Sequence, residues 1–216
     1  MSELNVDIPR MIAILKQASS DLKSHAEELR ELDAKLGDGD LGITIELATK
    51  AITDYLNSTS ETDIGKLFAQ VAMNINQASP STFGTILSSA FMGGGRAAMG
   101  KTQLGLEDFA AIGEGAIENI MKRGKANVGD KTVLDALVPA VKTLKIELSA
   151  GVSDKEVIDT AVRAAEDGMK ATVNMKAKFG RAQWFKDGSI GIQDGGATAM
   201  YYLIQSFVNN VQWEEI

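Results

Sequence analysis

Three aspartates within eight residues are the strongest chemical feature of the sequence. Asp33, Asp38 and Asp40 stand in the stretch Leu-Asp-Ala-Lys-Leu-Gly-Asp-Gly-Asp-Leu-Gly, which runs from residue 32 to residue 42. Asp33 lies at a helix end, and the other two are two residues apart in a glycine-spaced loop, so their side chains can turn to one side. Converging carboxylate oxygens suit Mg²⁺, which takes the rest of its shell from water and substrate phosphates. We therefore expect a magnesium site at this turn.

The next helix is expected to begin near Gly42, directly beside these aspartates. The first amides of a helix have no partner within it, and the helix dipole favours an anion there. A cation next to a helix N-terminus suits the phosphates of a nucleotide. The alternative is a set of solvated turn and capping aspartates. A calcium-binding EF-hand does not fit, because loops begun at Asp33 or Asp38 place Thr44 or Thr49 where a glutamate is needed.

Two glycine-rich stretches match nucleotide-binding patterns, but their surroundings argue against both. Residues 95–102 fit G-x-x-x-x-G-K-[ST], a motif that needs a strand before it and a helix starting at its Lys-Thr. Here the preceding segment has the pattern of a helix. Residues 37–42 fit G-x-G-x-x-G, yet this stretch follows a helix and carries two carboxylates that would repel a pyrophosphate. We expect neither a P-loop nor a Rossmann site.

The composition excludes several kinds of chemistry. The 216 residues include no cysteine and one histidine, so thiol nucleophiles, disulfides and multi-histidine metal sites are ruled out. The net charge of −7 argues against general nucleic-acid binding. His25, the single histidine, is expected to be an exposed residue on the polar side of a helix. Carboxylates, backbone amides, hydroxyls, Lys and Arg remain to do the chemistry.

The elements that position these groups are expected to be helices, because apolar residues recur every three or four positions along the chain. We see no alternating strand pattern, and we predict one all-α domain over residues 1–216, an antiparallel barrel or bundle of about eight helices with the site at one end. The first ten residues lack a signal segment and no apolar run could span a bilayer, so we expect a cytoplasmic protein. The predicted helices are 7–32, 42–56, 64–75, 82–99, 107–122, 134–144, 157–169 and 200–208.

Four stretches, in order, resemble the nucleotide-binding (L) subunit of the dihydroxyacetone kinases. The first is the aspartate loop, and the others are Ala78–Thr85, Arg123–Asp135 and Gly180–Thr198. The resemblance extends from about residue 7 to residue 212, which is nearly the whole chain. It implies an eight-helix antiparallel barrel with a nucleotide at one end.

The resemblance also implies a role for individual residues. Asp33, Asp38 and Asp40 would hold two Mg²⁺ ions that bridge the phosphates of ADP or ATP. No residue is expected to act as an acid or base, although Arg181 is a candidate for stabilising charge during transfer. The residues implied in nucleotide binding are Leu41, Gly42, Ile43 and Thr44 at the helix start, Ala78 and Ser79 in the phosphate loop, Gly124 and Val133 beside adenine, and Arg181, Asp194, Gly195 and Gly196 in a mobile lid.

Taken alone, several of these residues have structural explanations. Gly124 and Val133 would be a helix C-cap and a core residue, Arg181 a surface cation, and Ser79 with Ser81 a capping pair. The sequence also departs from the family, with Leu41 in place of a histidine, Pro80 in place of a glycine, and Gly195 in place of a proline. The chain therefore resembles a divergent paralogue.

The resemblance implies a phosphotransferase acting in glycerol metabolism as one subunit of a multi-subunit kinase. The phosphoryl group would pass to dihydroxyacetone, or a related short ketose, held on a separate K-type subunit. Bound ADP recharged by a phosphohistidine protein of a phosphotransferase system is the expected donor, and free ATP is the other. The rivals are a nucleotide-sensing regulatory or adaptor subunit without turnover, a phosphatase, and a kinase for a longer ketose. The oligomeric state stays open, with a homodimer among the options, and no nucleic acid or membrane partner is expected.

Overall fold

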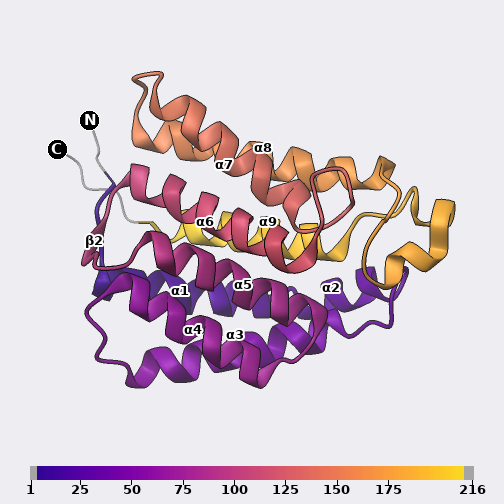
Figure 1. The fold of residues 1–216 in the computed structure, drawn as a ribbon, viewed down its shortest axis with the longest axis horizontal. Coiled ribbons are helices and arrows are strands. Elements are labelled where there is room, and N and C mark those ends of the chain that lie inside the picture. The colour runs from indigo at the N-terminus through magenta and orange to yellow at the C-terminus, as the bar shows by residue number, and fades with distance from the viewer. Residues whose placement is uncertain (1–3, 212–216) are drawn as a thin grey trace.

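The computed structural model describes residues 4–211, so residues 1–3 and 212–216 of the predicted domain lie outside the described part. Nine α-helices, two short 3-10 helices and two two-residue strands make up these residues (Figure 1). The helices are α1 (Ile8–Ser24), α2 (Ala26–Asp33), α3 (Leu41–Ser58), α4 (Ile64–Ala78), α5 (Thr82–Ala97), α6 (Leu106–Gly124), α7 (Leu134–Leu148), α8 (Asp154–Ala171) and α9 (Gly195–Asn209). The remaining elements are β1 (Val6–Asp7), β2 (Gln103–Leu104), η1 (Thr172–Asn174) and η2 (Arg181–Ser189).

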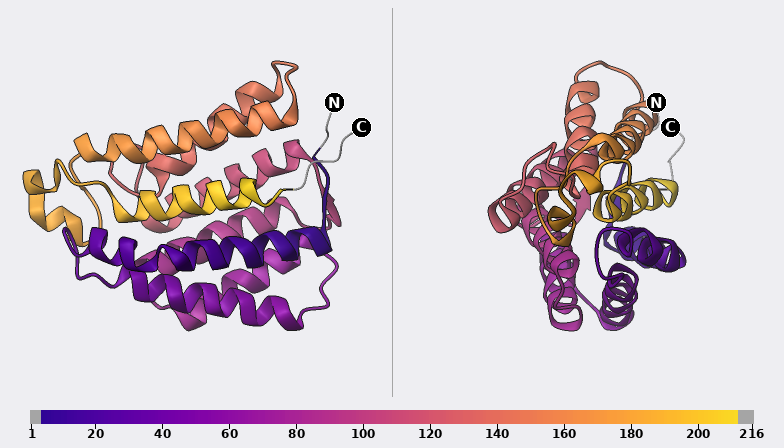
Figure 2. Two further views of the ribbon diagram at one scale, coloured as in Figure 1. Left: turned by 180° about the vertical axis from the view of Figure 1, so that it is seen from behind. Right: turned by 90° about the vertical axis from the view of Figure 1, so that its right-hand side faces the viewer.

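The helices close into a barrel. From α3 onward each α-helix packs against the next in the chain, and α9 returns to pack against α1, which itself contacts α3. The helices run along the long axis of the molecule, and α2 continues the direction of α1 (Figures 1 and 2). The barrel therefore has eight positions, with α1 and α2 sharing one. The prediction of an all-α barrel of about eight helices is confirmed.

Side chains placed just before the helices explain where many of them begin. In each case an Asp or Ser at the N-cap accepts a hydrogen bond from the amide three residues later, which satisfies one of the free donors of the first turn. The N-cap residues that do so are Asp7, Asp63, Ser81, Ser153 and Asp194.

The first predicted helix is in fact two helices, so the expectation of one helix over residues 7–32 is wrong. The α-helical hydrogen-bonding is interrupted at His25, which separates α1 from α2. The His25 ring stacks on Tyr202 of α9 with 4.0 Å between ring centroids, and its Nδ1 lies 3.1 Å from Glu28 Oε2. His25 is thus partly covered rather than free on a polar face, because α9 packs against this junction.

Residues 95–102 do not form a P-loop. Helix α5 runs up to Ala97, and the chain then turns toward the start of α4. There the Gly100 amide donates to Asp63 Oδ2 at 3.0 Å, and the carbonyl of Lys101 accepts from the Ile64 amide. The Lys101 ammonium pairs with Asp108 at 2.7 Å. This stretch joins helices structurally, as the sequence predicts.

The two strands were not expected from the sequence. Val6 pairs with Leu104 and Asp7 with Gln103 in an antiparallel ribbon that ties the start of α1 to the segment before α6. Strands of two residues are too short to show an alternating pattern. The ribbon lies at the end of the barrel opposite α2 and η2 (Figure 1).

The barrel interior is apolar and holds a cavity of about 270 Å³ lined by residues such as Phe91, Leu137 and Met200. Leucine and isoleucine side chains of every long helix contribute to the buried clusters around it. Within residues 4–211, no helix combines the length and apolar character needed to cross a membrane.

Candidate functional site

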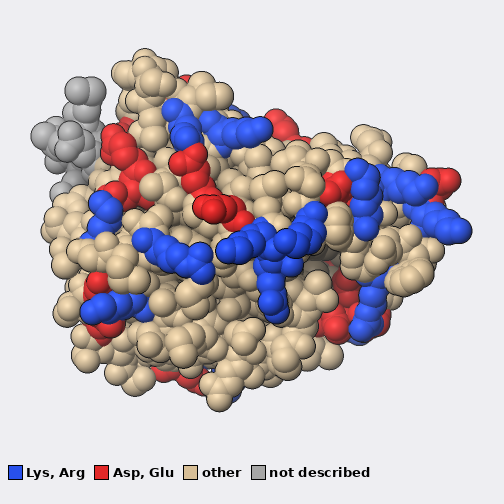
Figure 3. Space-filling view, in the orientation of Figure 1, with Lys and Arg blue, Asp and Glu red and all other residues tan. Residues whose placement is uncertain are grey.

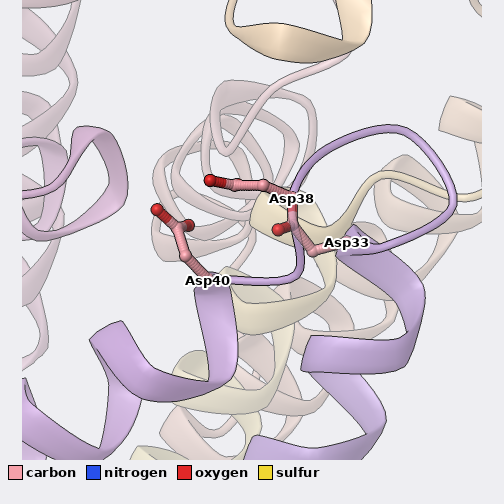
Figure 4. Close-up of side chains that lie close together, drawn as sticks. All are labelled: Asp33, Asp38 and Asp40. Carbon is pink, nitrogen blue, oxygen red and sulfur yellow. The ribbon is translucent and has the colours of Figure 1, made fainter.

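The three aspartates of the predicted metal site lie close together between α2 and α3. Asp33 is the last residue of α2, Asp40 immediately precedes α3, and Asp38 lies in the loop between them. One carboxylate oxygen from each lies within 4.8 Å of the others, and all three side chains extend to the same side of the loop (Figure 4). Gly39, with φ of +71°, allows the loop to turn between Asp38 and Asp40.

The electrostatics of this cluster suit a bound cation. Asp33 Oδ2 is buried and has no hydrogen-bond partner among the described residues, although buried carboxylate oxygens are normally satisfied. Burial, and then the neighbouring Asp33 charge, raise the pKa of Asp40 above its ordinary value. Mutual repulsion and an orphaned oxygen are the features that a divalent ion would relieve. An all-oxygen donor set of this kind fits Mg²⁺.

The position of the Asp33 carboxylate depends on Gly37. A Cβ atom at Gly37 would lie 2.8 Å from Asp33 Oδ1, which is closer than van der Waals contact allows. Glycine here lets the loop backbone pass directly over the carboxylate. The glycine spacing of the loop therefore contributes to the geometry of the acidic cluster.

A pocket of about 670 Å³ opens beside the acidic cluster at this end of the barrel. Its polar part includes the three aspartates, Arg181, Lys131 and Asp194, and its apolar part includes Ile86, Ile120, Val133 and Phe179. A concave site lined by apolar side chains and a few charged groups is typical of small-molecule binding.

The structure brings most of the predicted site residues to this pocket. The three aspartates are joined there by Leu41, Gly124, Val133, Arg181, Asp194, Gly195 and Gly196. Leu41, the first residue of α3, is 5% exposed, and a Cβ at Gly195 would approach its side chain to 2.9 Å. The predicted helix start and the predicted lid therefore meet at the pocket.

Five predicted residues do not line the pocket: Gly42, Ile43, Thr44, Ala78 and Ser79. Gly42 and Thr44 are buried in the first turn of α3, whereas the Ile43 side chain is exposed. Ser79 is buried and its Oγ donates to the Thr44 carbonyl at 3.4 Å, so these residues join α3 to the loop before α5. From that loop and the start of α5, the pocket is lined instead by Pro80, Ser81, Thr82 and Phe83.

Residues 172–192, called the lid below, pass over the pocket. Phe179, Gly180, Arg181 and Ala182 of the lid face the pocket. Arg181 forms an ion pair with Asp38, which links the lid to the acidic cluster. Figure 1 shows the lid projecting beyond the ends of the barrel helices.

Asp194, two residues after the lid, caps α9. Its Oδ2 accepts from the Ala197 amide at 2.6 Å, and its own amide donates to Thr172 Oγ1 at 3.0 Å. Burial raises the pKa of Asp194 to about 6, while the Ala197 hydrogen bond and the charge of Lys131 oppose the rise. Asp194 therefore fixes the junction between the lid and the barrel.

Sequence reasoning missed Lys131, which lines the pocket and is only 2% exposed. An isolated lysine in a glycine-containing loop normally suggests a solvated side chain. The one available signal was its position in the Gly-Asp-Lys-Thr stretch at residues 129–132, to which no role was assigned.

A closed helical barrel with an acidic cluster beside a pocket defines an all-α domain with a candidate small-molecule site. The sequence matches the family described as "DAK2 domain" over residues 35–209, and the chain belongs to this family. It is 27% identical over 191 residues to the Escherichia coli "PEP-dependent dihydroxyacetone kinase, ADP-binding subunit DhaL", covering 88% of this chain and 91% of that protein. It is likewise 27% identical to a Listeria innocua protein, "PEP-dependent dihydroxyacetone kinase 2, ADP-binding subunit DhaL", covering 98% and 99%.

Longer proteins also contain a related region. The human "Triokinase/FMN cyclase" is 30% identical over 208 residues, which cover 94% of this chain and 35% of that protein. Among solved structures, the dihydroxyacetone kinase from C. freundii in complex with AMP-PNP and Mg²⁺ superposes with a TM-score of 0.71 at 24% identity, covering 92% of this chain and 33% of that one. The chain thus spans about a third of these two proteins, and the structural likeness shows a shared fold.

Proposed function

We propose that this chain is the ADP- or ATP-binding subunit of a kinase for dihydroxyacetone or a related short ketose. The observation that carries the proposal is the convergence of Asp33, Asp38 and Asp40 beside the pocket. Family membership supports it, because two relatives that match this chain over nearly their full length are named ADP-binding subunits.

In this proposal the three aspartates hold two Mg²⁺ ions. When bound, Mg²⁺ supplies positive charge that neutralises the phosphoryl oxygens during transfer. The orphaned Asp33 Oδ2 is a ready ligand atom, and Asp40 lies at the N-terminus of α3. The first-turn amide of Leu41, which lines the pocket, receives a phosphate oxygen, while Gly42 and Ile43 continue the same first turn of α3.

The apolar part of the pocket takes the nucleoside. Phe179 and Val133 supply flat apolar surface for a base, and Gly124 leaves room at the pocket wall. Thr44 and Ser79 act indirectly, because Thr44 Oγ1 donates to Ser81 Oγ at 3.0 Å and so orients the loop at residues 78–82, which also carries Ala78.

The lid contributes charge and closure. Arg181 pairs with Asp38 in the structure and is placed to contact phosphate oxygens when metal occupies the aspartates. A positioned guanidinium stabilises negative charge that develops during phosphoryl transfer. Asp194, Gly195 and Gly196, where the lid joins α9, lie against Leu41 and Val133.

The phosphoryl acceptor is proposed to be bound on a separate K-type subunit, with ADP recharged by a phosphohistidine protein. The outer side of the lid carries exposed apolar residues, with Trp184 79% and Phe185 48% exposed. Exposed aromatic residues beside a site mark surfaces for protein contacts. The charges are also uneven despite the net −7, because Lys and Arg gather across the middle of one face and at the lid end (Figure 3).

Phosphoryl transfer with a purified K-type subunit tests the proposal. Wild type is expected to support transfer to dihydroxyacetone, from a phosphohistidine donor or from ATP, and Asp38→Ala is expected to abolish it. The rival function is a nucleotide-sensing adaptor, favoured by the apolar Leu41 and by the Arg181–Asp38 ion pair, which engages one of the three aspartates. If wild type and Asp38→Ala are equally inert while both bind the partner, the kinase function is wrong.

A further inference from the structure

Lys131 is a buried cation just before α7, although lysine side chains are rarely buried. Its backbone lies in the left-handed region, with φ of +64°, three residues before α7 begins. The ammonium group donates to the carbonyls of Thr172 and Ser189 at 2.7 Å, and of Met175 at 3.2 Å. The carbonyl of Ile192 accepts a fourth contact.

These four carbonyls come from both stems of the lid. Thr172 and Met175 precede the lid tip, and Ser189 and Ile192 follow it. A single side chain from another part of the chain therefore binds both ends of the lid at once.

The two stems are also bonded to each other above the ammonium. The Ala177 amide donates to Ser189 Oγ at 2.9 Å, and the Gly191 amide donates to the Val173 carbonyl at 2.7 Å. The lid is therefore a closed loop at its base, and residues 178–188 form the tip beyond these two hydrogen bonds. That tip carries Phe179 and Arg181 to the pocket.

The cost of burying unpaired polar groups favours a fixed position for the two lid stems around Lys131. Burying an ammonium is costly unless its N–H groups are satisfied, and burying carbonyls without donors is costly too. Lys131 has three N–H donors for its acceptors, so loss of the side chain would leave several carbonyls without a partner. Asp194, the N-cap of α9, adds a favourable charge nearby.

We propose that Lys131 is a positioning residue that clamps both stems of the lid and thereby sets the places of Phe179 and Arg181 over the pocket. Motion of the lid is then confined to the tip at residues 178–188. The consequence for ligand affinity rests on the proposed nucleotide function, whereas the clamp itself does not.

Hydrogen–deuterium exchange on the full chain tests the clamp without any ligand. Lys131→Met is expected to speed exchange at Ala177 and Gly191 by about tenfold or more, because each lost bond to a charged donor is worth more than a factor of ten. Exchange in α1 and α4 should change little. Lys176→Met is the matched control, because Lys176 lies on the same stem but forms an exposed ion pair with Asp187.

Affinity for ADP–Mg²⁺ is the second readout. Lys131→Met should weaken binding by about tenfold, and Lys176→Met should stay within about twofold of wild type. Lys131→Arg keeps the charge and the donors, so it should retain slow exchange and most of the affinity. If Lys131→Met does not fold, amide exchange in Lys131→Arg still tests the clamp.

Three results would overturn the clamp. These are unchanged lid exchange in Lys131→Met, equal acceleration in all helices, and equal loss of protection in Lys131→Arg and Lys131→Met. Failure of wild type to bind ADP–Mg²⁺ would instead contradict the proposed function. The exchange data on the free protein would still test whether Lys131 holds the two lid stems.

Discussion

Arg181 of the lid forms an ion pair with Asp38 of the acidic loop, although 143 residues separate them in the sequence. The contact joins the element that covers the pocket to the group proposed to bind metal. Both side chains are substantially exposed, at 61% and 40%, so the pair is screened and weak. Under the proposed function, a metal ion and the guanidinium would compete for the same carboxylate.

Replacing Arg181 should therefore strengthen binding of metal alone. Because an exposed ion pair is worth about 0–1 kcal/mol, Arg181→Gln is expected to tighten Mg²⁺ or Mn²⁺ binding without nucleotide by about two- to fivefold. Lys176→Gln is the control, since it removes the same charge from the lid but pairs with Asp187. Titration of both variants with Mn²⁺ checks this, and unchanged or weaker metal binding in Arg181→Gln would contradict the competition.

A second prediction concerns Gly37. Gly37→Ala would place a methyl group 2.8 Å from Asp33 Oδ1, and the carboxylate would have to move away from the cluster. Gly37 does not adopt a left-handed backbone, so the change should weaken Mg²⁺-dependent nucleotide binding with little effect on the melting temperature. Gly105→Ala, where the new atom meets only ordinary contacts, should leave binding unchanged. Equal nucleotide affinities of the two variants in the presence of Mg²⁺ would show that the position of the Asp33 carboxylate does not affect binding.

The pH dependence of stability gives a third prediction, through Asp194. Burial raises its pKa from 3.8 to about 6 in the folded chain. Between these values the folded chain holds a proton that the unfolded chain has released, so this group makes stability fall as pH rises from about 4 to about 6. Asp194→Asn keeps the N-cap acceptor and removes the buried charge.

In metal-free buffer, the free energy of unfolding of Asp194→Asn relative to wild type should therefore increase across this pH range, by about 3 kcal/mol between acidic and neutral pH. Urea unfolding of both chains at several pH values between about 4 and 7 measures it. A difference that stays constant with pH would mean that Asp194 does not titrate in this range.

The helices could be predicted well because their apolar stripes are strong and their starts carry Asp or Ser caps. The break at His25 could not, since the stripe of residues 7–32 continues through it and the interruption coincides with packing of Tyr202 on the histidine ring. The β1–β2 ribbon could not be predicted for a different reason: two residues per strand are too few to show an alternation of apolar and polar residues.

At the site, the acidic cluster could be anticipated because its members are close in sequence and the glycines restrict the loop. The pairing of Arg181 with Asp38 and the burial of Lys131 could not, because both depend on contacts between distant segments. The four carbonyls around Lys131 lie 41 to 61 residues further along the chain. Local spacing carries no information about such contacts.

Calorimetric titration with ADP, with and without Mg²⁺, tests the central claim most directly. Wild type is expected to bind ADP only with Mg²⁺ present, Asp38→Ala to lose binding, and Lys101→Ala to bind like wild type, because Lys101 pairs with Asp108 away from the pocket. Binding that persists in EDTA or in Asp38→Ala, or that disappears in Lys101→Ala, would contradict a nucleotide site built on the three aspartates.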